Sequence, residues 1–329
     1  MPRDISQTGP ILEVEGLHTI LRTSEGIVRA VTDVSITVGR GEIVGIVGES
    51  GCGKSMTAMS IMGLVPTPPG DITEGRILLD GSELRGLGQS AFQKVRGRRI
   101  AMIFQDPMTY LNPVLTIGTQ IDEMLRQHMD LDRAGRARRV IELLRRVRIP
   151  DPERVAAAYP HQLSGGMRQR VLIATAISCD PELIIADEPT TALDVTVQAQ
   201  VLELLKEIIR DMDSSLILIT HDLGVVAETC DRVYVMYAGR VIEEAPMQRL
   251  FEQPGHPYTQ GLLASILRAD QPVEELYALD GTVPNLTAPP KGCAFCDRCA
   301  VVMDICHSEL PPRAATGPRA FAACWRIPQ

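Results

Sequence analysis

Continuous apolar runs along the chain predict buried strands. Three such runs lie at residues 41–48, 183–189 and 214–221. Runs of this kind are typical of strands that are buried on both faces. Apolar residues with helical spacing fill residues 195–212, between the second run and the third. Because strands and helices alternate here, the sequence favours a parallel α/β sheet.

The pattern changes on either side of this core. Alternating apolar and polar residues at 11–20 and 30–38 predict further strands, and residues 231–245 predict a closing hairpin. Between about residues 106 and 160, helical spacing with many arginines predicts a helical insertion whose charged face meets solvent. After about residue 251 the chain becomes rich in proline, glycine and cysteine, which predicts a small appended module.

Composition narrows the class of protein. The chain has 329 residues, of which 45% are apolar and 22% charged, as in soluble globular proteins. A net charge of -8 argues against a dedicated nucleic-acid binder, which usually has a basic domain. No apolar run approaches the roughly 20 residues of a membrane-spanning helix, and the first ten residues lack the apolar core of a signal peptide. We therefore expect a cytosolic protein that reaches a membrane only by docking on another subunit.

A phosphate-binding loop follows the first buried run. Its eight residues fit the pattern G-x-x-x-x-G-K-[ST] and are Gly48, Glu49, Ser50, Gly51, Cys52, Gly53, Lys54 and Ser55. Glycines let backbone N–H groups turn toward phosphates, and the helix that follows presents its positive end to them. We expect Lys54 to neutralise phosphate oxygens and the Ser55 hydroxyl to bind Mg²⁺.

Two carboxylates, Asp187 and Glu188, close the second buried run. If the chain turns at the end of the strand, both side chains can face one ligand. We expect Asp187 to hold Mg²⁺ through water and Glu188 to act as the general base that polarises the attacking water.

A second candidate anion site lies at Ser164, Gly165 and Gly166, where a small-residue turn precedes a helical segment. Two phosphate-binding helix starts are hard to bring to one nucleotide within a single chain.

Together these motifs resemble the nucleotide-binding subunits of ABC transporters, over nearly the whole chain. Residues 48–55 match the family's Walker A motif, 163–170 its signature motif and 183–189 its Walker B motif. The resemblance implies that two subunits enclose two ATP molecules, each held by one Walker A motif and the partner's signature. This pairing explains the second anion site.

The resemblance also assigns further residues. Gln105 matches the Q-loop glutamine, Ala192, Leu193 and Asp194 match the D-loop, and His221 matches the switch histidine. In the signature, Ser164, Gly165, Gly166 and Gln169 are expected to contact the partner's ATP. Relatives stack an aromatic residue on adenine where this chain has Arg29, so base contact by Arg29, by Val28 or by neither stays open.

The implied fold is a RecA-like P-loop NTPase core with an antiparallel β subdomain, a helical subdomain and a Cys-rich C-terminal module. We divide the chain into a nucleotide-binding domain at 1–250, with its helical subdomain at about 106–165, and a module at 251–329.

The C-terminal module narrows the resemblance. Residues 255–263, with His256, Pro257, Tyr258 and Thr259, resemble subunits that energise dipeptide, oligopeptide and nickel importers. We interpret His256 itself as a capping or packing residue. The resemblance implies peptide import at the cytoplasmic face of the cell membrane. The implied partners are a second, different ATPase subunit, two permeases and an extracytoplasmic solute-binding protein. Nickel, glutathione and opines are alternative cargoes, and a soluble ABC ATPase acting on ribosomes or DNA is a weaker alternative.

Five of the eight cysteines crowd into this module, which in a reducing compartment indicates a metal site. Spacing alone suits an Fe–S cluster that could include Cys296, with Zn²⁺ as the alternative. The resemblance implies a [4Fe–4S] cluster on Cys293, Cys299, Cys306 and Cys324, and unmetallated thiols also stay open. The other three, Cys52, Cys179 and Cys230, are interpreted as P-loop and core residues.

Overall fold

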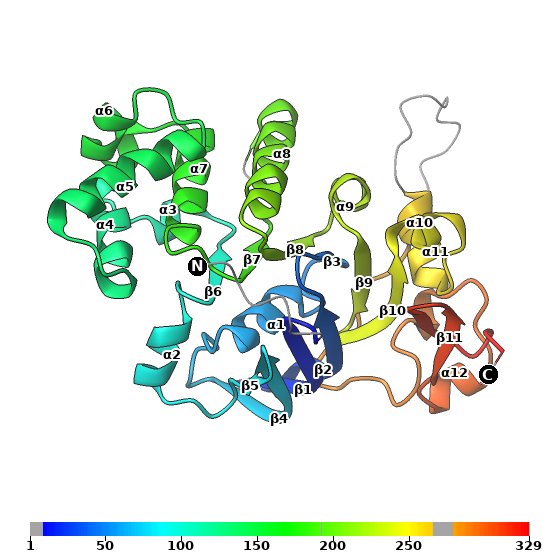
Figure 1. Ribbon diagram of the computed structural model, residues 1–329. Coiled ribbons are helices and arrows are strands. Elements are labelled where there is room, and N and C mark those ends of the chain that lie inside the picture. The colour runs from blue at the N-terminus through cyan, green and yellow to red at the C-terminus, as the bar shows by residue number, and fades with distance from the viewer. Residues whose placement is uncertain (1–8, 192, 266–278, 329) are drawn as a thin grey trace. The chain divides into compact units, whose positions relative to one another are not determined.

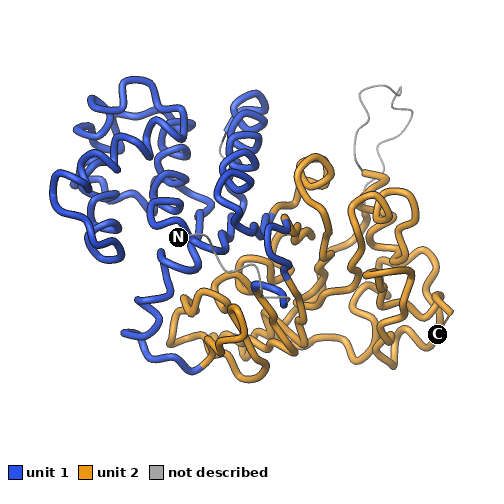
Figure 2. Tube along the Cα trace, viewed as in Figure 1, with its two compact units in different colours: residues 1–11, 38–42, 86–219 blue, residues 12–37, 43–85, 220–329 orange. Residues whose placement is uncertain are grey.

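The computed structural model describes residues 9–191, 193–265 and 279–328, and they divide into two compact units (Figure 2). One unit contains residues 1–11, 38–42 and 86–219, and the other contains 12–37, 43–85 and 220–329. Each unit is described below by itself.

The second unit contains a four-stranded sheet in the order β2-β1-β4-β5 (Figure 1). Its strands are β1 (Leu12–Thr23), β2 (Gly26–Val38), β4 (Gly70–Leu79) and β5 (Ser82–Glu83). The antiparallel pairing of β1 with β4 places Leu12 opposite Leu79 and Val14 opposite Ile77. All four side chains are buried, so the predicted alternation does place one face of these strands in the core.

The same unit holds five further strands in the order β11-β12-β10-β9-β3. Their bounds are β3 (Ile43–Val47), β9 (Arg232–Tyr237), β10 (Arg240–Pro246), β11 (Arg313–Gly317) and β12 (Ala320–Ala323). β3 and β9 are parallel, and β9, β10, β12 and β11 pair antiparallel in turn. The predicted strand at 41–48 and hairpin at 231–245 are confirmed.

Helices complete this unit. They are α1 (Lys54–Ile61), α9 (Leu223–Thr229), α10 (Met247–Glu252), α11 (Pro257–Ala264), α12 (Ile305–Ser308) and the 3₁₀ turn η2 (Cys296–Arg298). α9 packs closely on β3, since a Cβ added to Gly45 would lie 2.7 Å from a Val226 methyl carbon.

The first unit contains three parallel strands in the order β8-β7-β6. They are β6 (Ile100–Ile103), β7 (Leu183–Asp187) and β8 (Ser215–Thr220), and every residue in them is buried. The predicted double burial of the two later runs is therefore confirmed.

Figure 1 shows the helices of this unit gathered beside these strands. They are α2 (Gln89–Val95), α3 (Pro107–Tyr110), α4 (Ile117–His128), α5 (Arg133–Arg146), α6 (Pro152–Ala157), η1 (Pro160–Gln162), α7 (Gly165–Ala176) and α8 (Val195–Asp211). The helical insertion is confirmed. Arg145 of α5 is 63% exposed and pairs with Glu153, as expected for a solvated face. Arg136 and Arg139 are instead mostly covered, and they pair with Asp122 and Asp180.

A buried ion pair joins two strands of the second unit. Arg232 in β9 is only 3% exposed and pairs with Glu244 in β10. Its guanidinium also donates to the carbonyl oxygen of Thr37 at 2.9 Å. Loss of the arginine would leave the partly buried Glu244 carboxylate without its counter-ion.

We expect Arg232→Met to lower the free energy of unfolding by about 3 kcal/mol, measured by urea denaturation. The control is Arg22→Met, because Arg22 forms an exposed pair with Asp71 at 3.8 Å and should change stability by less than about 1 kcal/mol. If both variants lowered the free energy of unfolding equally, the buried pair would not be more stabilising than the exposed pair, and the prediction would be wrong.

Candidate functional site

The predicted phosphate loop lies between β3 and α1, and its backbone requires glycine at two places. Gly48 has φ 153°, and a Cβ there would lie 2.2 Å from the carbonyl oxygen of Met236. Gly53 has φ 103°, and a Cβ there would lie 2.4 Å from the carbonyl oxygen of Ala30. No side chain fits either space, so the loop keeps its shape only with glycine.

Lys54, the first residue of α1, directs its ammonium back into this loop. The side chain is 5% exposed, and Nζ donates to the carbonyl oxygens of Gly48 at 2.8 Å and Glu49 at 3.0 Å. Cys52 is buried beside it, and burial raises the pKa of the Cys52 thiol. The loop therefore holds one cation at a helix N-terminus, which suits the phosphates of a nucleotide.

Other predicted residues of this unit lie on the surface. Ser50, Gly51 and Ser55 are exposed in the loop and the first turn of α1, and His221 is exposed directly after β8. Arg29 is exposed on β2, and its backbone N–H donates to the carbonyl oxygen of Leu286 at 3.0 Å. Contact between Arg29 and adenine stays a prediction.

The predicted carboxylates lie in the first unit, where the chain turns sharply after β7. Asp187 is the last residue of the strand and is 6% exposed. Glu188 has φ 44°, a left-handed conformation that redirects the chain directly after the strand. Its backbone N–H donates to the carbonyl oxygen of Ile219 at 2.9 Å, which fixes this turn against β8.

The structure brings Gln105 to Glu188. The Gln105 amide donates to the Glu188 carboxylate at 3.0 Å, and the Thr191 hydroxyl donates to the same oxygen at 2.8 Å. Thr191 was not among the sequence-predicted residues. Its signal in the sequence was only its place three residues after Glu188.

The signature residues form the start of α7. Ser164 is the N-cap, and its hydroxyl accepts a hydrogen bond from the N–H of Met167 at 3.4 Å. Ser164 and Gly165 are exposed. Gln169 is 1% exposed, and its Nε2 has no hydrogen-bond partner among the described residues. Contact with the ATP of a second subunit would require the Gln169 side chain to leave this position.

Asp194 of the D-loop caps α8, where its carboxylate accepts from the N–H of Val197 at 3.0 Å. Leu193 precedes it, and Ala192 lies outside the described residues. A Cβ added to Gly165 would lie 3.7 Å from Leu193, so the D-loop packs against the signature turn.

Five cysteines of the C-terminal module line one small pocket in the second unit, namely Cys293, Cys296, Cys299, Cys306 and Cys324. The backbone N–H of Cys293 donates to the carbonyl oxygen of Cys306 at 2.7 Å. Burial, followed by the neighbouring thiols, raises the pKa of Cys293 to about 11. Burial also raises the pKa of Cys324, and Cys299 and Cys306 add to the increase. The neighbouring thiols thus disfavour the thiolate form of Cys293 and Cys324.

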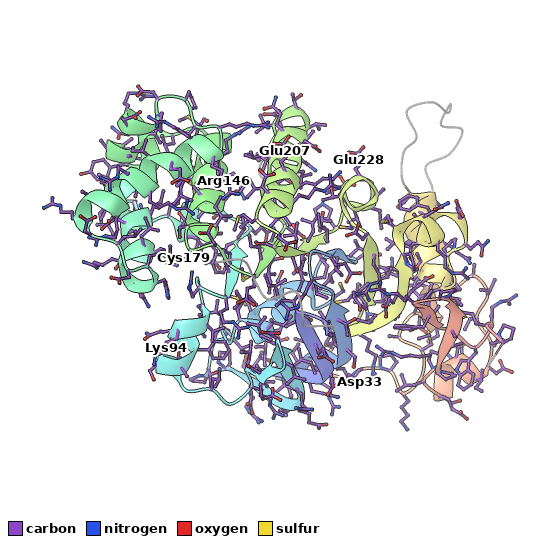
Figure 3. The ribbon with its side chains drawn as sticks, viewed as in Figure 1. Asp33, Lys94, Arg146, Cys179, Glu207 and Glu228 are labelled. Carbon is purple, nitrogen blue, oxygen red and sulfur yellow. The ribbon has the colours of Figure 1, made fainter. Side chains whose placement is uncertain are left out.

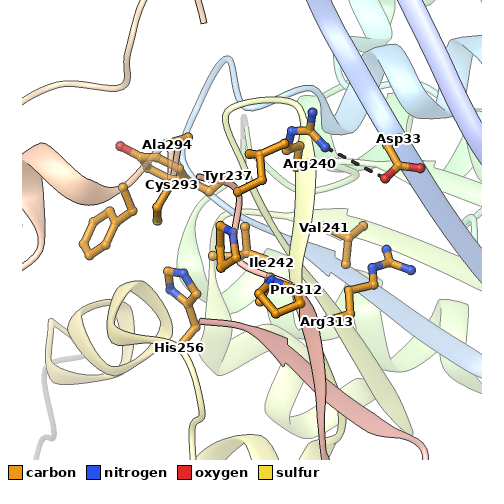
Figure 4. Close-up of a pocket in the computed structure, with 14 residues that line it drawn as sticks. Asp33, Tyr237, Arg240, Val241, Ile242, His256, Cys293, Ala294, Pro312 and Arg313 are labelled. Carbon is orange, nitrogen blue, oxygen red and sulfur yellow. Dashed lines mark ion pairs between the residues drawn. The ribbon is translucent and has the colours of Figure 1, made fainter. Parts of the chain in front are cut away.

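A second pocket of about 250 Å³ adjoins the first, and four residues line both: His256, Cys293, Phe295 and Pro311 (Figure 4). Arg240 on its rim pairs with Asp33 at 3.9 Å. Cys293 therefore lines a pocket together with residues of β10, namely Arg240, Val241 and Ile242.

His256 has the structural role that the sequence predicted. It is the N-cap of α11, and its Nδ1 accepts a hydrogen bond from the N–H of Tyr258 at 3.0 Å. Burial lowers the pKa of His256 to about 4, so the ring is neutral near pH 7 and can accept this bond.

The sequence did not predict that the module contacts the phosphate loop. Arg298 pairs with the Glu49 carboxylate at 2.8 Å, and the Tyr258 hydroxyl accepts from the Glu49 N–H at 2.9 Å. In the sequence, only the position of Arg298 between Cys296 and Cys299 could have drawn attention to this residue.

A glycine loop that surrounds a buried lysine, between a buried parallel strand and a helix, defines a P-loop nucleotide-binding protein. None of the helices in the described part of the chain combines the length and hydrophobicity of a membrane span.

Family models match two parts of the chain. Residues 31–191 match "ABC transporter", and residues 242–306 match "Oligopeptide/dipeptide transporter, C-terminal region". Among curated proteins, the dipeptide transport ATP-binding protein DppD of Bacillus subtilis is 50% identical over 96% of this chain and 94% of its own. The oligopeptide transport ATP-binding protein OppD of the same organism is 48% identical over 96% of this chain and 89% of its own.

Solved structures agree with this fold. The dimeric ATP-binding cassette MJ0796 bound to ADP and Pi has a TM-score of 0.65 and 29% identity, over 72% of this chain and 98% of that one. The cbiO1 protein of Clostridium perfringens has a TM-score of 0.63 and 29% identity, over 74% of this chain and 92% of that one. The chain belongs to the ABC transporter family, among the ATP-binding subunits of the dipeptide and oligopeptide type, and is an ATPase.

Lys54→Ala removes the ammonium group that binds the carbonyl oxygens of the glycine loop. We expect the Kd for Mg-ATP, measured by titration calorimetry, to rise by about a hundredfold or more, because charge-assisted contacts to phosphate are lost. Lys94→Ala is the control, since Lys94 is exposed on α2 (Figure 3). A similar loss in both variants would contradict a specific role for Lys54.

Proposed function

We propose that this ATPase drives import of dipeptides or oligopeptides across the cytoplasmic membrane. The observation that carries the proposal is the match of residues 242–306 to the C-terminal region of oligopeptide/dipeptide transporters. Relatives near 50% identity over almost the whole chain carry dipeptide or oligopeptide transport in their names. Nickel, glutathione and opines remain alternative cargoes, because the subunits that bind cargo are not in this chain.

In the proposed mechanism, Lys54 and the backbone of residues 48–53 hold the phosphates of ATP. When bound, Mg²⁺ neutralises phosphate charge, and the Ser55 hydroxyl and Asp187 are the residues that would hold it. Glu188 acts as the general base toward water, and His221 contacts the γ-phosphate side of the site. The observed bond from Gln105 supports this assignment, because it orients the Glu188 carboxylate.

Gln105 also suits a sensor of nucleotide state. It immediately precedes Asp106, which caps α3 at the start of the helical part of its unit. A change in the Gln105–Glu188 bond would therefore reach these helices. We propose that they transmit the state of the site to two permease subunits, which places the chain on the cytoplasmic face of the membrane.

A second ATPase subunit completes the proposed site. Ser164 and Gly165 are exposed at the start of α7, as expected of groups that serve the nucleotide of a neighbour. The cassette MJ0796, 29% identical, is described as dimeric with ADP and Pi bound. We propose that the neighbour is a different paralogue and that a solute-binding protein delivers the cargo outside the cell.

Glu188→Gln tests both hydrolysis and import. We expect ATPase turnover to fall by about a hundredfold or more, because the base is lost, while the Kd for ATP stays within a few fold and ATP traps a dimer. Uptake of a radiolabelled dipeptide by cells that carry only this variant should be lost.

The control is Glu203→Gln, on an exposed position of α8, which should retain turnover and uptake. Turnover near that of the parent protein in Glu188→Gln would refute the base assignment. Normal dipeptide uptake by a variant without turnover would instead refute the peptide-import proposal.

We further propose that Cys293, Cys299, Cys306 and Cys324 hold a [4Fe–4S] cluster. The support is the chemistry of the pocket, which is lined by thiols from three separate parts of the module. When bound, such a cluster would link these parts covalently. The Cys296 Sγ instead contacts the Asp297 carboxylate at 3.4 Å, which suits a residue outside the ligand set.

Zinc is the alternative, because four thiolates also suit a structural Zn²⁺ site. Within the described ranges, Cys296, Asp297 and His307 form a group whose possible ligand atoms lie within 4.8 Å of one another. Metal analysis therefore has to distinguish the two ions.

We expect protein purified without oxygen to be brown, to absorb broadly near about 400 nm and to contain about four irons per chain. Cys299→Ser should lose iron and colour, and Cys230→Ser, which changes a buried core thiol, should keep both. Colourless parent protein with stoichiometric zinc would overturn the cluster assignment.

A further inference from the structure

Glu49, the second residue of the phosphate loop, is held by the C-terminal module at two points. The Arg298 guanidinium forms a two-pronged pair with its carboxylate, at 2.8 and 3.0 Å. The Tyr258 hydroxyl accepts a hydrogen bond from its backbone N–H at 2.9 Å. Its backbone carbonyl oxygen, in turn, accepts from Lys54 Nζ at 3.0 Å. Glu49 thus connects the module to Lys54 in the phosphate loop.

Arg298 is held by other parts of the module as well as by Glu49. Its side chain is 6% exposed. Its Nε donates to the carbonyl oxygen of Asp280 at 2.7 Å. Its Nη2, which also bonds to Glu49, donates to the carbonyl oxygen of Leu279 at 3.1 Å. The hydrogen bonds to the Glu49 carboxylate raise the pKa of Arg298. A planar guanidinium with its other donors satisfied loses little entropy when it binds a carboxylate in this way.

The same part of the module reaches the cysteine pocket. Arg298 ends the turn η2, which begins at Cys296, and Cys299 follows directly. Phe295 lines the cysteine pocket and packs on Tyr237 and Tyr258, with ring centroids 5.4 Å apart in both pairs. A shift of the cysteine run would therefore move both residues that hold Glu49.

We propose that Arg298 is a positioning residue for nucleotide binding: through Glu49 it fixes the backbone that holds Lys54, so the conformation of the cysteine module sets nucleotide affinity. This inference rests on the nucleotide site and does not need the cysteines to hold a particular metal.

The test is a double-mutant cycle in the full-length protein, with Mg-ADP titrated by calorimetry so that hydrolysis plays no part. We expect Arg298→Gln and Glu49→Gln each to raise the Kd about tenfold. The double variant should be no weaker than either single variant, because both remove the same interaction. Arg298→Lys should restore part of the affinity.

Arg313→Gln is the matched control. Arg313 lies in the same module but over the Phe321 ring, 4.4 Å from its centroid. The Kd of Arg313→Gln for Mg-ADP should stay within twofold of that of the parent protein. In steady-state assays, Arg298→Gln should raise KM for ATP more than it lowers kcat. Unchanged Kd in Arg298→Gln, or losses that multiply in the double variant, would overturn the proposal.

Metal analysis separates this proposal from the cluster assignment. Arg298→Gln should bind ADP weakly while it keeps the metal content and absorbance of the parent protein. Cys299→Ser should weaken ADP binding whether or not the parent protein contains iron, because it disturbs the same turn. If weak ADP binding occurs only in variants that have lost metal, the metal and not Arg298 positions the loop, and the proposal fails.

Discussion

The contact between the Lys54 ammonium and two carbonyl oxygens of its own loop is the constraint on which the nucleotide site depends. The lysine is almost fully buried, and the carbonyl oxygens of Gly48 and Glu49 are its acceptors. A buried cation needs such partners. They keep the ammonium at the start of α1, where the positive end of the helix also favours an anion. We therefore expect features that fix the loop backbone to affect the affinity for nucleotide.

Much of this arrangement was predictable from the sequence, because local rules determine it. Continuous apolar runs predicted β3 and β7 correctly, since a strand covered on both faces has no polar side to show. The glycines at 48 and 53 were predicted as loop residues, and the structure gives the reason: a backbone carbonyl oxygen occupies the place of each missing Cβ. A chain turn after Asp187 was only a condition in the sequence-based prediction, and the structure shows it as a left-handed conformation of Glu188.

The remainder depends on contacts between residues that are distant in the chain. Glu49 and Arg298 are 249 positions apart, and no periodicity or motif relates them. The strands β11 and β12 were not predicted, because Arg313–Gly317 and Ala320–Ala323 are rich in alanine and contain few β-branched residues. They become strands because β10 offers a free edge to β12. Tertiary pairing overrides local preference at these positions.

A module of this size buries little apolar surface of its own, so its order must come from what it contacts. Here it contributes Phe295 to an aromatic group with Tyr237 and Tyr258, and it adds two strands beside β10. Each of these attachments lies in the unit that carries the phosphate loop. An attachment that is needed for the module's own order is therefore also a support for the loop. A crosslink among the cysteines would stiffen both together, which gives a physical reason for the module to be joined to an ATPase.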